Sequence, residues 1–300
     1  MKIAILIPVF NNIRYTQVCL KNISEMLGKG DLKDYFEIIV IDDGSTDGTK
    51  EWIIKNYNEV HLLEGDGNLW WSGGINMGAK YAIGSLKTDY LLLWNNDIKI
   101  NDDYFSMLVK VAAEYDDTAL IGSKVYANME KKIVWTMGGI FNPKSGYTGM
   151  KAFMAEDTEE YQKPVEADWL TGMGTLVPSG VIREIGYWDE VNFPQYHGDT
   201  EFSYRAKLNG FKNIVDPRLI IWNDIENTGL NHGGSFSKLL RMTRDKRSLY
   251  NFRVNLKFHR LYAKNPFAYR HLIKIYFKLF GGFFKWKVLN IAGIKKDPVI

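Results

Sequence analysis

Three short apolar segments that run directly into polar residues constrain the fold of this chain more than any other feature. The segments cover residues 3–7, 39–41 and 91–94, and the motifs that follow them, each ending in or rich in polar residues, are 8–12, 42–48 and 95–97. Buried parallel strands read as continuous apolar runs, and they deliver polar groups to the carboxyl edge of an open sheet, where ligands bind. The sequence therefore predicts an α/β fold with a ligand site at that edge.

Strand-like and helix-like segments alternate through the first half of the chain, which is typical of βαβ units. We expect strands over 2–8, 36–41, 60–63, 89–94 and 119–125, and helices over 13–26, 47–56, 75–84 and 102–115. Residues 131–168 are polar and rich in glycine, which favours a hairpin or excursion over the ligand edge. A strand over 169–177 and a helix from Ser179 follow.

Composition narrows the class of protein. Three hundred residues with 46% apolar content are enough for a large packed core. A single cysteine, Cys19, excludes an intramolecular disulfide framework, and its apolar helical surroundings predict a buried structural thiol. The amino terminus does not resemble a signal peptide, and no apolar run is long enough to span a bilayer, so we expect a cytoplasmic protein.

The charge of the chain is divided unevenly. Residues 236–300 hold 16 Lys and Arg against two acidic residues, a balance of +14, whereas residues 1–235 hold 22 against 33, a balance of −11. This predicts a domain over 1–235 and a basic amphipathic helical tail over 236–300. Such a tail attracts an anionic membrane surface, or else its basic face is solvated while it packs on the first domain. No nucleic-acid recognition fold accompanies it.

Four motifs together resemble those of a known family. Residues 8–12, 42–48, 95–97 and 197–205 are similar, in that order, to the motifs of family 2 glycosyltransferases of the GT-A fold, and the rhamnosyltransferase-like branch is the nearest. The resemblance covers residues 1–235. It implies a mostly parallel open sheet flanked by helices, and a nucleotide-sugar donor bound at the sheet edge.

The resemblance also implies the donor-binding residues. Asp43 would accept the ring N3–H of uracil or thymine, Phe10 and Pro8 would line the base pocket, and Trp71 either stacks on the donor or packs within its loop. Ile75 stands where many members carry Arg. The expected donor-binding set is Pro8, Phe10, Asn11, Asp43, Trp71, Gly74, Asn76 and Asn96.

Asp97 is the expected ligand of a divalent metal. It is the last residue of an Asp-x-Asp-like element that here reads Asn95, Asn96, Asp97, and hard carboxylate oxygen suits Mg²⁺ or Mn²⁺ bridging a diphosphate. The alternative is an ordinary turn after a strand. By resemblance His232, which two glycines follow, is a second metal or diphosphate contact, although a lone histidine is more often structural.

Asp199 is the expected catalytic base. Residues 198–201 correspond to a Glu-Asp-x-Asp motif at a helix start, and an inverting transfer needs a base that removes the proton of the acceptor hydroxyl. Glu201 is the second candidate for the base. Asp199 as a helix cap is compatible with catalysis. Arg205, one turn beyond Glu201, is expected to pair with it.

These residues predict an inverting, metal-dependent transfer of a sugar from a UDP- or dTDP-sugar to a glycan or polyprenyl-linked acceptor in surface-polysaccharide assembly, at the inner face of the cell membrane. A Rossmann oxidoreductase is excluded because no Gly-x-Gly-x-x-Gly turn follows the first strand. Two alternatives stay open. One is a nucleotidyltransferase, which would want a basic glycine-rich loop after that strand, and the other is a non-catalytic glycan-binding or scaffolding protein, suggested by Asn95 and Asn96.

Overall fold

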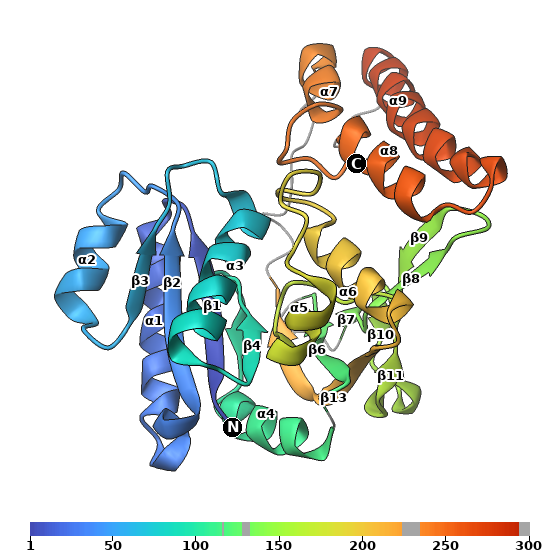
Figure 1. Cartoon of the computed structure of the whole chain (residues 1–300). Coiled ribbons are helices and arrows are strands. Elements are labelled where there is room, and N and C mark those ends of the chain that lie inside the picture. Colours follow the sequence, from blue (N-terminus) through green and yellow to red (C-terminus); the bar gives the residue numbers. More distant parts are fainter. Residues whose placement is uncertain (116, 128–132, 224–234, 294–300) are drawn as a thin grey trace. The chain divides into compact units, whose positions relative to one another are not determined.

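The chain separates into two compact units. The computed structural model describes residues 1–115, 117–127, 133–223 and 235–293. Unit 1 comprises Met1–Ile140, Met150–Pro194 and Gly198–Glu226, and unit 2 comprises Phe141–Gly149, Gln195–His197 and Asn227–Ile300. Figure 1 shows the elements of both units.

Unit 1 is built on one large twisted sheet (Figure 1). Its strands in the described residues are β1 (Ile3–Val9), β2 (Phe36–Asp42), β3 (His61–Glu64), β4 (Tyr90–Leu93), β5 (Lys99–Ile100), β6 (Ala119–Tyr126), β7 (Ile133–Thr136), β10 (Ala155–Glu156), β11 (Val165–Glu166), β12 (Thr175–Pro178) and β13 (Lys212–Trp222). The main order is β10-β7-β6-β12-β4-β1-β2-β3.

The three strands that carry the polar motifs run parallel and end at one edge. β4, β1, β2 and β3 are neighbours in that order and all parallel, with Val9 opposite Asp42 and Asp42 opposite Glu64. β12 inserts antiparallel between β4 and β6, and β13 runs parallel to β6. The sheet is therefore of the mostly parallel mixed type that the sequence predicts.

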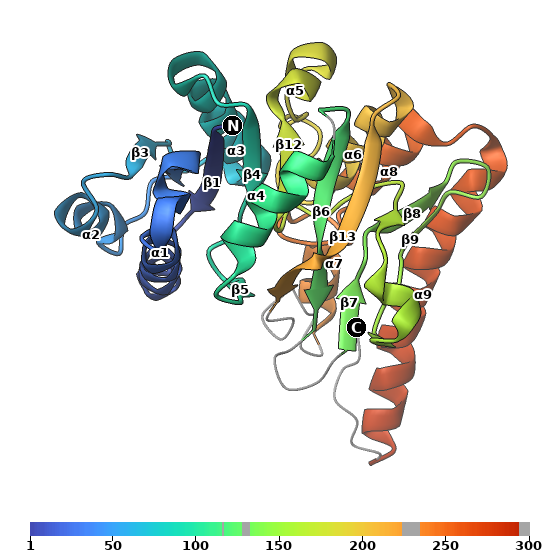
Figure 2. The same cartoon turned by 90° about the horizontal axis from the view of Figure 1, so that it is seen from below.

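Helices cover both faces of this sheet (Figure 2). α1 (Ile13–Leu27), α2 (Thr49–Asn56) and α4 (Tyr104–Glu114) pack with the odd-numbered residues of β1, and α3 (Trp70–Tyr81), α5 (Ser179–Ile185) and α6 (Gly198–Leu208) pack on the opposite face with Ala4 and Leu6. Alternate side chains of a strand point to opposite faces, so a central strand that is apolar throughout needs two layers of helices. Both layers are present.

The predicted α/β fold is confirmed, and most predicted elements lie within two residues of their observed bounds. Two predictions were wrong. The helix expected from residue 75 begins at Trp70, and the strand expected over 169–177 begins at Thr175. Gly174 has a φ of +63°, a conformation outside the strand region, and the amide of Gly172 is bonded to a side chain instead of to a neighbouring strand.

The strands of the glycine-rich stretch divide between two sheets. β7, β10 and β11 join the large sheet, whereas β8 (Gly139–Asn142) and β9 (Tyr147–Met150) pair in a separate two-stranded sheet. Cys19 is buried as predicted, and burial raises the pKa of its thiol to about 12, so it stays protonated and chemically inert at neutral pH.

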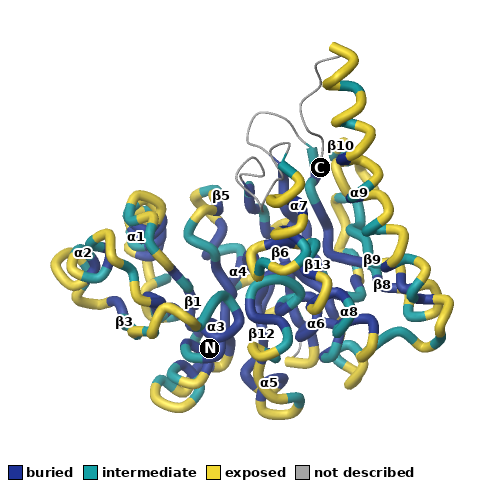
Figure 3. Tube along the Cα trace, turned by 90° about the horizontal axis from the view of Figure 1, so that it is seen from above, coloured by how far each residue is buried: buried dark blue, intermediate teal, exposed yellow. Residues whose placement is uncertain are grey.

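Unit 2 contains the basic helices α7 (Phe236–Met242), α8 (Phe252–Tyr262) and α9 (Tyr269–Ile291). Its small apolar core joins Leu239 and Met242 of α7 to Leu279 and Phe283 of α9. Over the residues that the structure describes, no helix is both long and apolar enough to cross a bilayer. Figure 3 shows the contrast in burial between the central strands of the large sheet, which are mostly dark blue, and α9, which is mostly yellow and teal.

Candidate active site

The turn after β4 presents one carboxylate to solvent. Asn95 accepts a hydrogen bond at Oδ1 from Trp71 Nε1 at 3.2 Å, and Asn96 donates from Nδ2 to Thr16 Oγ1 at 3.1 Å. Both amides are half-buried, and Asp97 is exposed. The two asparagines therefore fix the turn, and Asp97 is the group of this motif that a ligand in solution can reach.

Trp71 connects this turn to the candidate base. A Cβ atom at Gly172 would lie 2.2 Å from Trp71 Cζ2, so the indole rests on the bare backbone of that glycine. The amide of Gly172 donates to Asp199 Oδ2 at 2.8 Å, and Asp199 Oδ1 accepts from the amide of Thr200 at 2.7 Å. Asn95, Trp71, Gly172 and Asp199 thus form a continuous series of contacts from the end of β4 to the start of α6.

Asp199 lies at the start of α6, where the backbone supports a negative charge. The amino end of a helix carries a partial positive charge, and the two backbone hydrogen bonds orient the carboxylate. The side chain is half-buried and is not enclosed in the core. A carboxylate with these properties is suited to accept a proton from a bound hydroxyl.

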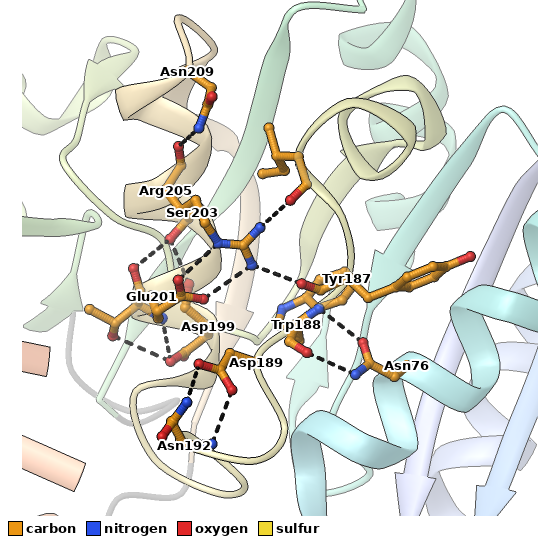
Figure 4. Close-up of polar contacts among 12 residues, drawn as sticks. Asn76, Tyr187, Trp188, Asp189, Asn192, Asp199, Glu201, Ser203, Arg205 and Asn209 are labelled. Atoms are coloured by element: carbon orange, nitrogen blue, oxygen red, sulfur yellow. Dashed lines mark hydrogen bonds and ion pairs between the residues drawn. The ribbon is translucent and has the colours of Figure 1, made fainter. Parts of the chain in front are cut away.

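Glu201 has a different environment. It is 3% exposed, and its carboxylate accepts from Arg205 Nε at 2.8 Å and from Nη2 at 3.2 Å, which confirms the predicted pair. Arg205 also donates to the carbonyl oxygens of Ile185 at 2.5 Å and Tyr187 at 2.8 Å (Figure 4). Arg205, held by Glu201, therefore ties α6 to the end of α5 and to the segment that follows it.

Asp43 is bonded to the start of α3. Its Oδ1 accepts from the amides of Gly67 at 2.9 Å and Leu69 at 3.2 Å, and its Oδ2 accepts from the amide of Trp70 at 3.0 Å. Trp70 has a φ of +59°, a left-handed conformation that a bulky residue adopts only under constraint. The buried carboxylate of Asp43 supplies that constraint, which is why α3 starts five residues earlier than predicted.

Hydrogen bonds join the loops after β1 and β2. Asn11 Oδ1 accepts from the amide of Thr46 at 2.9 Å, and Asp47 accepts from the amide of Ile13 at 2.8 Å. Burial alone would raise the pKa of Asp47, but its hydrogen bonds from Thr49 and Ile13 outweigh that effect and lower it. Asn11 and Asp47 thus hold the two loops together at the sheet edge.

Pro8 and Gly74 bring β1 and α3 close together, and Phe10 follows β1 at the surface. Phe10 is 56% exposed at the carboxyl end of β1. A Cβ atom at Gly74 would lie 3.1 Å from Pro8 Cβ, so this glycine lets α3 approach β1 closely. The exposed ring of Phe10 therefore follows a strand, β1, against which α3 packs closely.

Asn76 anchors a segment that the sequence did not single out. Its Nδ2 donates to the carbonyl of Trp188 at 2.9 Å, and its Oδ1 accepts from the amide of Trp188 at 3.0 Å (Figure 4). The same Nδ2 also donates to Glu190 at 2.6 Å. Ser72 donates to the carbonyl of Phe193 at 2.6 Å. The sequence signal that could have pointed to this segment is its aromatic residues between α5 and α6. For Gly172, the sequence offered no signal except that a glycine stands within a predicted strand.

The carboxylates of the site do not form a complete metal cage. In the described ranges, His, Cys, Asp and Glu side chains nowhere gather in a group of three or more that could hold a metal ion. His232 lies outside the described residues. The single exposed carboxylate of Asp97 fits Mg²⁺ or Mn²⁺ of the kind that is held by one or two carboxylates together with substrate phosphates.

Two curated proteins share sequence similarity with this chain. Low-salt glycan biosynthesis hexosyltransferase Agl10 of Haloferax volcanii is 27% identical over 177 residues, covering 57% of this chain and 53% of that protein. An N-acetylglucosaminyl-diphospho-decaprenol L-rhamnosyltransferase of Mycobacterium tuberculosis is 23% identical over 201 residues, covering 60% and 64%. The matches thus span between half and two thirds of these relatives.

Solved structures agree on the fold. GalNAc-T7 with UDP, GalNAc and Mn²⁺ superposes with a TM-score of 0.57 at 13% identity, over 94% of this chain and 58% of that one. S. aureus TarS 1-349 superposes with a TM-score of 0.50 at 14% identity, over 86% and 70%. These likenesses identify the GT-A fold. Residues 4–167 match the family described as glycosyl transferase family 2, and the chain belongs to that family.

Proposed function

We propose that this protein transfers a sugar, with inversion, from a UDP- or dTDP-sugar to a glycan or polyprenyl-linked acceptor in the assembly of a surface polysaccharide. Family membership supports a glycosyltransferase, and the two curated relatives bear names from glycan assembly. Residues 1–235 carry the chemistry, and the basic residues 236–300 bring the enzyme to the inner face of the cell membrane.

The contact series from Asn95 to Asp199 is the observation that carries this proposal. Through Trp71 and Gly172, it connects the end of β4, where we expect the donor, to the carboxylate of Asp199, where we expect the acceptor. Asp199 takes the proton of the acceptor hydroxyl while the oxygen forms a bond to the anomeric carbon, and the bond from that carbon to the nucleotide diphosphate breaks. The backbone amides at Asp199 hold its carboxylate in place for this step.

Donor recognition is assigned to the sheet edge. Phe10 stacks on the base, and Asp43 accepts the imide N–H through Oδ2, which has one internal hydrogen bond against two for Oδ1. The backbone around this pocket is held in place by Pro8, Gly74, Asn11 and Asn96. Asn76 contributes by holding the segment at Trp188. The indole of Trp71 faces the sugar.

Asp97 would hold a Mg²⁺ or Mn²⁺ ion together with the diphosphate, with His232 as a further ligand. Such an ion supplies positive charge that stabilises the departing diphosphate. Because this chain offers one exposed carboxylate at the turn, donor and metal should bind together and each should be weak without the other.

Glu201 is the less suitable base. Its carboxylate is buried and engaged by Arg205, and a group that gives up such a pair to accept a proton leaves a guanidinium uncompensated. A structural role for Glu201 and a chemical one for Asp199 fit their environments.

Asp199→Asn tests the proposal. The amide keeps the shape of the side chain but cannot accept a proton, so transfer should fall 10²- to 10⁴-fold, the usual contribution of a positioned base, while UDP or dTDP binding by calorimetry stays unchanged. Asp189→Asn, a change at a carboxylate bonded to Asn192, is the matched control and should keep its rate.

Three outcomes would contradict it. Near wild-type transfer by Asp199→Asn with loss in Glu201→Gln would make Glu201 the base. Nucleotide binding without any sugar transfer by the wild type, across a panel of UDP- and dTDP-sugars and glycan acceptors, would favour the scaffolding alternative. Release of diphosphate from a nucleoside triphosphate and a sugar phosphate would identify a nucleotidyltransferase.

A further inference from the structure

The long helix α9 exposes a second apolar face. Its large exposed apolar residues recur at intervals of three, four or seven, so they project from roughly a sixth of the helix circumference. Phe277 is 75% exposed and Ile291 is 81% exposed. These residues, here called the apolar stripe, are Ile273, Phe277, Phe284, Val288 and Ile291.

Most of the apolar stripe lies away from the face with which α9 packs in its own unit, and the ring of Phe284 also neighbours that of Phe236 in α7. Leu272, Leu279 and Phe283 are the buried residues of the helix, and the last two pack with Leu239 and Met242 of α7. A surface helix needs one apolar face for its core, and the remaining surface is usually polar. Contiguous exposed apolar surface marks an interaction site.

Positive charge lies beside the apolar stripe. Lys274, Lys278 and Lys285 are exposed on an adjacent face of α9, and the helix contains no Asp or Glu over its whole length. Residues 236–300 carry 16 Lys and Arg against two acidic residues. The partner of this face should therefore be both apolar and anionic.

An open groove between α8 and α9 continues the same surface. It has a volume of about 500 Å³ and an almost wholly apolar lining that includes Leu256, Ile273 and Phe277. A neighbouring pocket of about 660 Å³ shares Phe252, Tyr276 and Phe280 with this groove and adds Arg244 and Arg253. Hydrocarbon and cationic surfaces thus meet within unit 2.

We propose that the apolar stripe and this groove are a docking face for a bilayer of anionic phospholipid. The apolar stripe lies at the level of the acyl chains near the interface, while the lysines of α9, with Arg244 and Arg253, contact lipid phosphates. The inference deepens the proposed function, on whose membrane location it rests, by naming the residues that insert. A second copy of the chain fits less well, because two faces with the same strong positive charge repel each other.

The first experiment measures partition of the full chain onto vesicles of phosphatidylcholine with or without phosphatidylglycerol. Phe277→Ala should weaken partition onto the anionic vesicles about tenfold, because it removes a large apolar group from the membrane interface. Phe153→Ala removes a Phe that is 60% exposed in unit 1, and it should bind as the wild type does. Lys274→Gln with Lys278→Gln should weaken partition at low salt and much less at high salt.

The second experiment tests insertion itself. The chain has one cysteine, so Cys19→Ser gives a background in which a polarity-sensitive dye can be attached at a new cysteine. A dye at Phe284→Cys should shift to the blue when anionic vesicles are added, and a dye at Lys278→Cys should shift much less. Circular dichroism checks that each variant is folded.

Equal partition of Phe277→Ala and wild type would overturn the proposal, and so would unshifted dyes on vesicles that bind the protein. Concentration-dependent dimers that Phe277→Ala abolishes, without vesicle binding, would assign the apolar stripe to a second copy. Binding only to an acidic protein would assign it to that class of partner. None of these readouts needs donor or metal, and Asp199→Asn should bind vesicles normally, so failure here is distinguishable from failure of the proposed chemistry.

Discussion

The two units treat charged and apolar side chains in opposite ways. Unit 1 buries charge in bonded pairs: Glu201 with Arg205, and Lys124 with Asp157 at 2.5 Å, where Lys124 is 1% exposed. Unit 2 exposes large apolar side chains on α9 beside exposed lysines. The buried pairs of unit 1 hold charged side chains in fixed positions, as a catalytic site requires. Unit 2 instead presents an apolar and cationic surface to solvent.

The difference follows from core size. The two clusters that flank the sheet of unit 1 enclose apolar residues from both faces of every central strand. The core of unit 2 contains Leu239, Met242, Leu279 and Phe283. Leu272 of the long helix is also buried, but Ile273, Phe277, Phe284, Val288 and Ile291 remain exposed. A small domain buries a smaller fraction of its surface, so its exposed apolar residues need a partner.

The largest effect that would sharpen the comparison concerns Gly172. A methyl group there would meet Trp71 at 2.2 Å, so Gly172→Ala must displace the indole or the amide that is bonded to Asp199. A displacement of about 1 Å in a catalytic group costs about a hundredfold in rate, and we expect that loss of transfer. Gly180→Ala, where no atom lies within 4 Å of the new Cβ, is the control and should keep its rate. An unimpaired Gly172→Ala would mean that rigidity at this contact is unimportant.

A smaller effect is expected at Asp97. Asp97→Ala should remove the gain in UDP or dTDP affinity that Mn²⁺ gives, about tenfold, because the turn loses its exposed carboxylate while its asparagines keep it folded. Calorimetry with and without Mn²⁺ measures this, and Asp102→Ala, at an exposed residue paired with Lys29, is the control. A metal-dependent gain that survives in Asp97→Ala would place the metal ligand elsewhere in the chain.

The smallest effect concerns unit 2. Hydrogen bonds from Arg247, followed by those from Arg241, lower the pKa of Asp245 to about 2, against burial, which raises it. A carboxyl group whose pKa is lower in the folded state stabilises the fold above pH 4, and this contribution is lost as the pH falls from about 4 to 2. Asp245→Asn should therefore cost about 1 kcal/mol at pH 6 and little at pH 2.5.

Thermal unfolding of both proteins across this pH range provides the measurement, with Asp34→Asn, an exposed site, as control. A gap between wild type and Asp245→Asn that does not narrow on acidification would show that the charge of Asp245 adds nothing to the stability of unit 2.

The sequence predicted the fold because its signals are local. Apolar runs that end in polar residues predicted the strands β1, β2 and β4 and the edge at which they meet, and the ordered motifs predicted the family. The early start of α3 could not be predicted, since it depends on hydrogen bonds from the amides near Trp70 to Asp43, some 27 residues away. Likewise, the contact of Asn76 with Trp188 joins residues 112 positions apart, and no local pattern encodes it.

The site residues themselves stay predictions, and the structure divides them by environment. Asp97 and Phe10 are exposed, whereas Glu201 and Asn76 are buried with internal partners. Sequence motifs identify residue types but not their solvent access, because access depends on neighbours contributed by other segments. The choice between Asp199 and Glu201 rests on that information.

On the donor assignment proposed above, the three backbone hydrogen bonds of Asp43 limit how the donor preference could change during evolution. A new nucleotide preference obtained by replacing Asp43 would also release the amides of Gly67, Leu69 and Trp70, and with them the left-handed backbone at Trp70, which stores about 1–3 kcal/mol of strain. A substitution of Asp43 would therefore change nucleotide recognition and the folding of the start of α3 at the same time. Shifts in donor preference should instead accumulate at the exposed Phe10, where a side chain can change without releasing the start of α3.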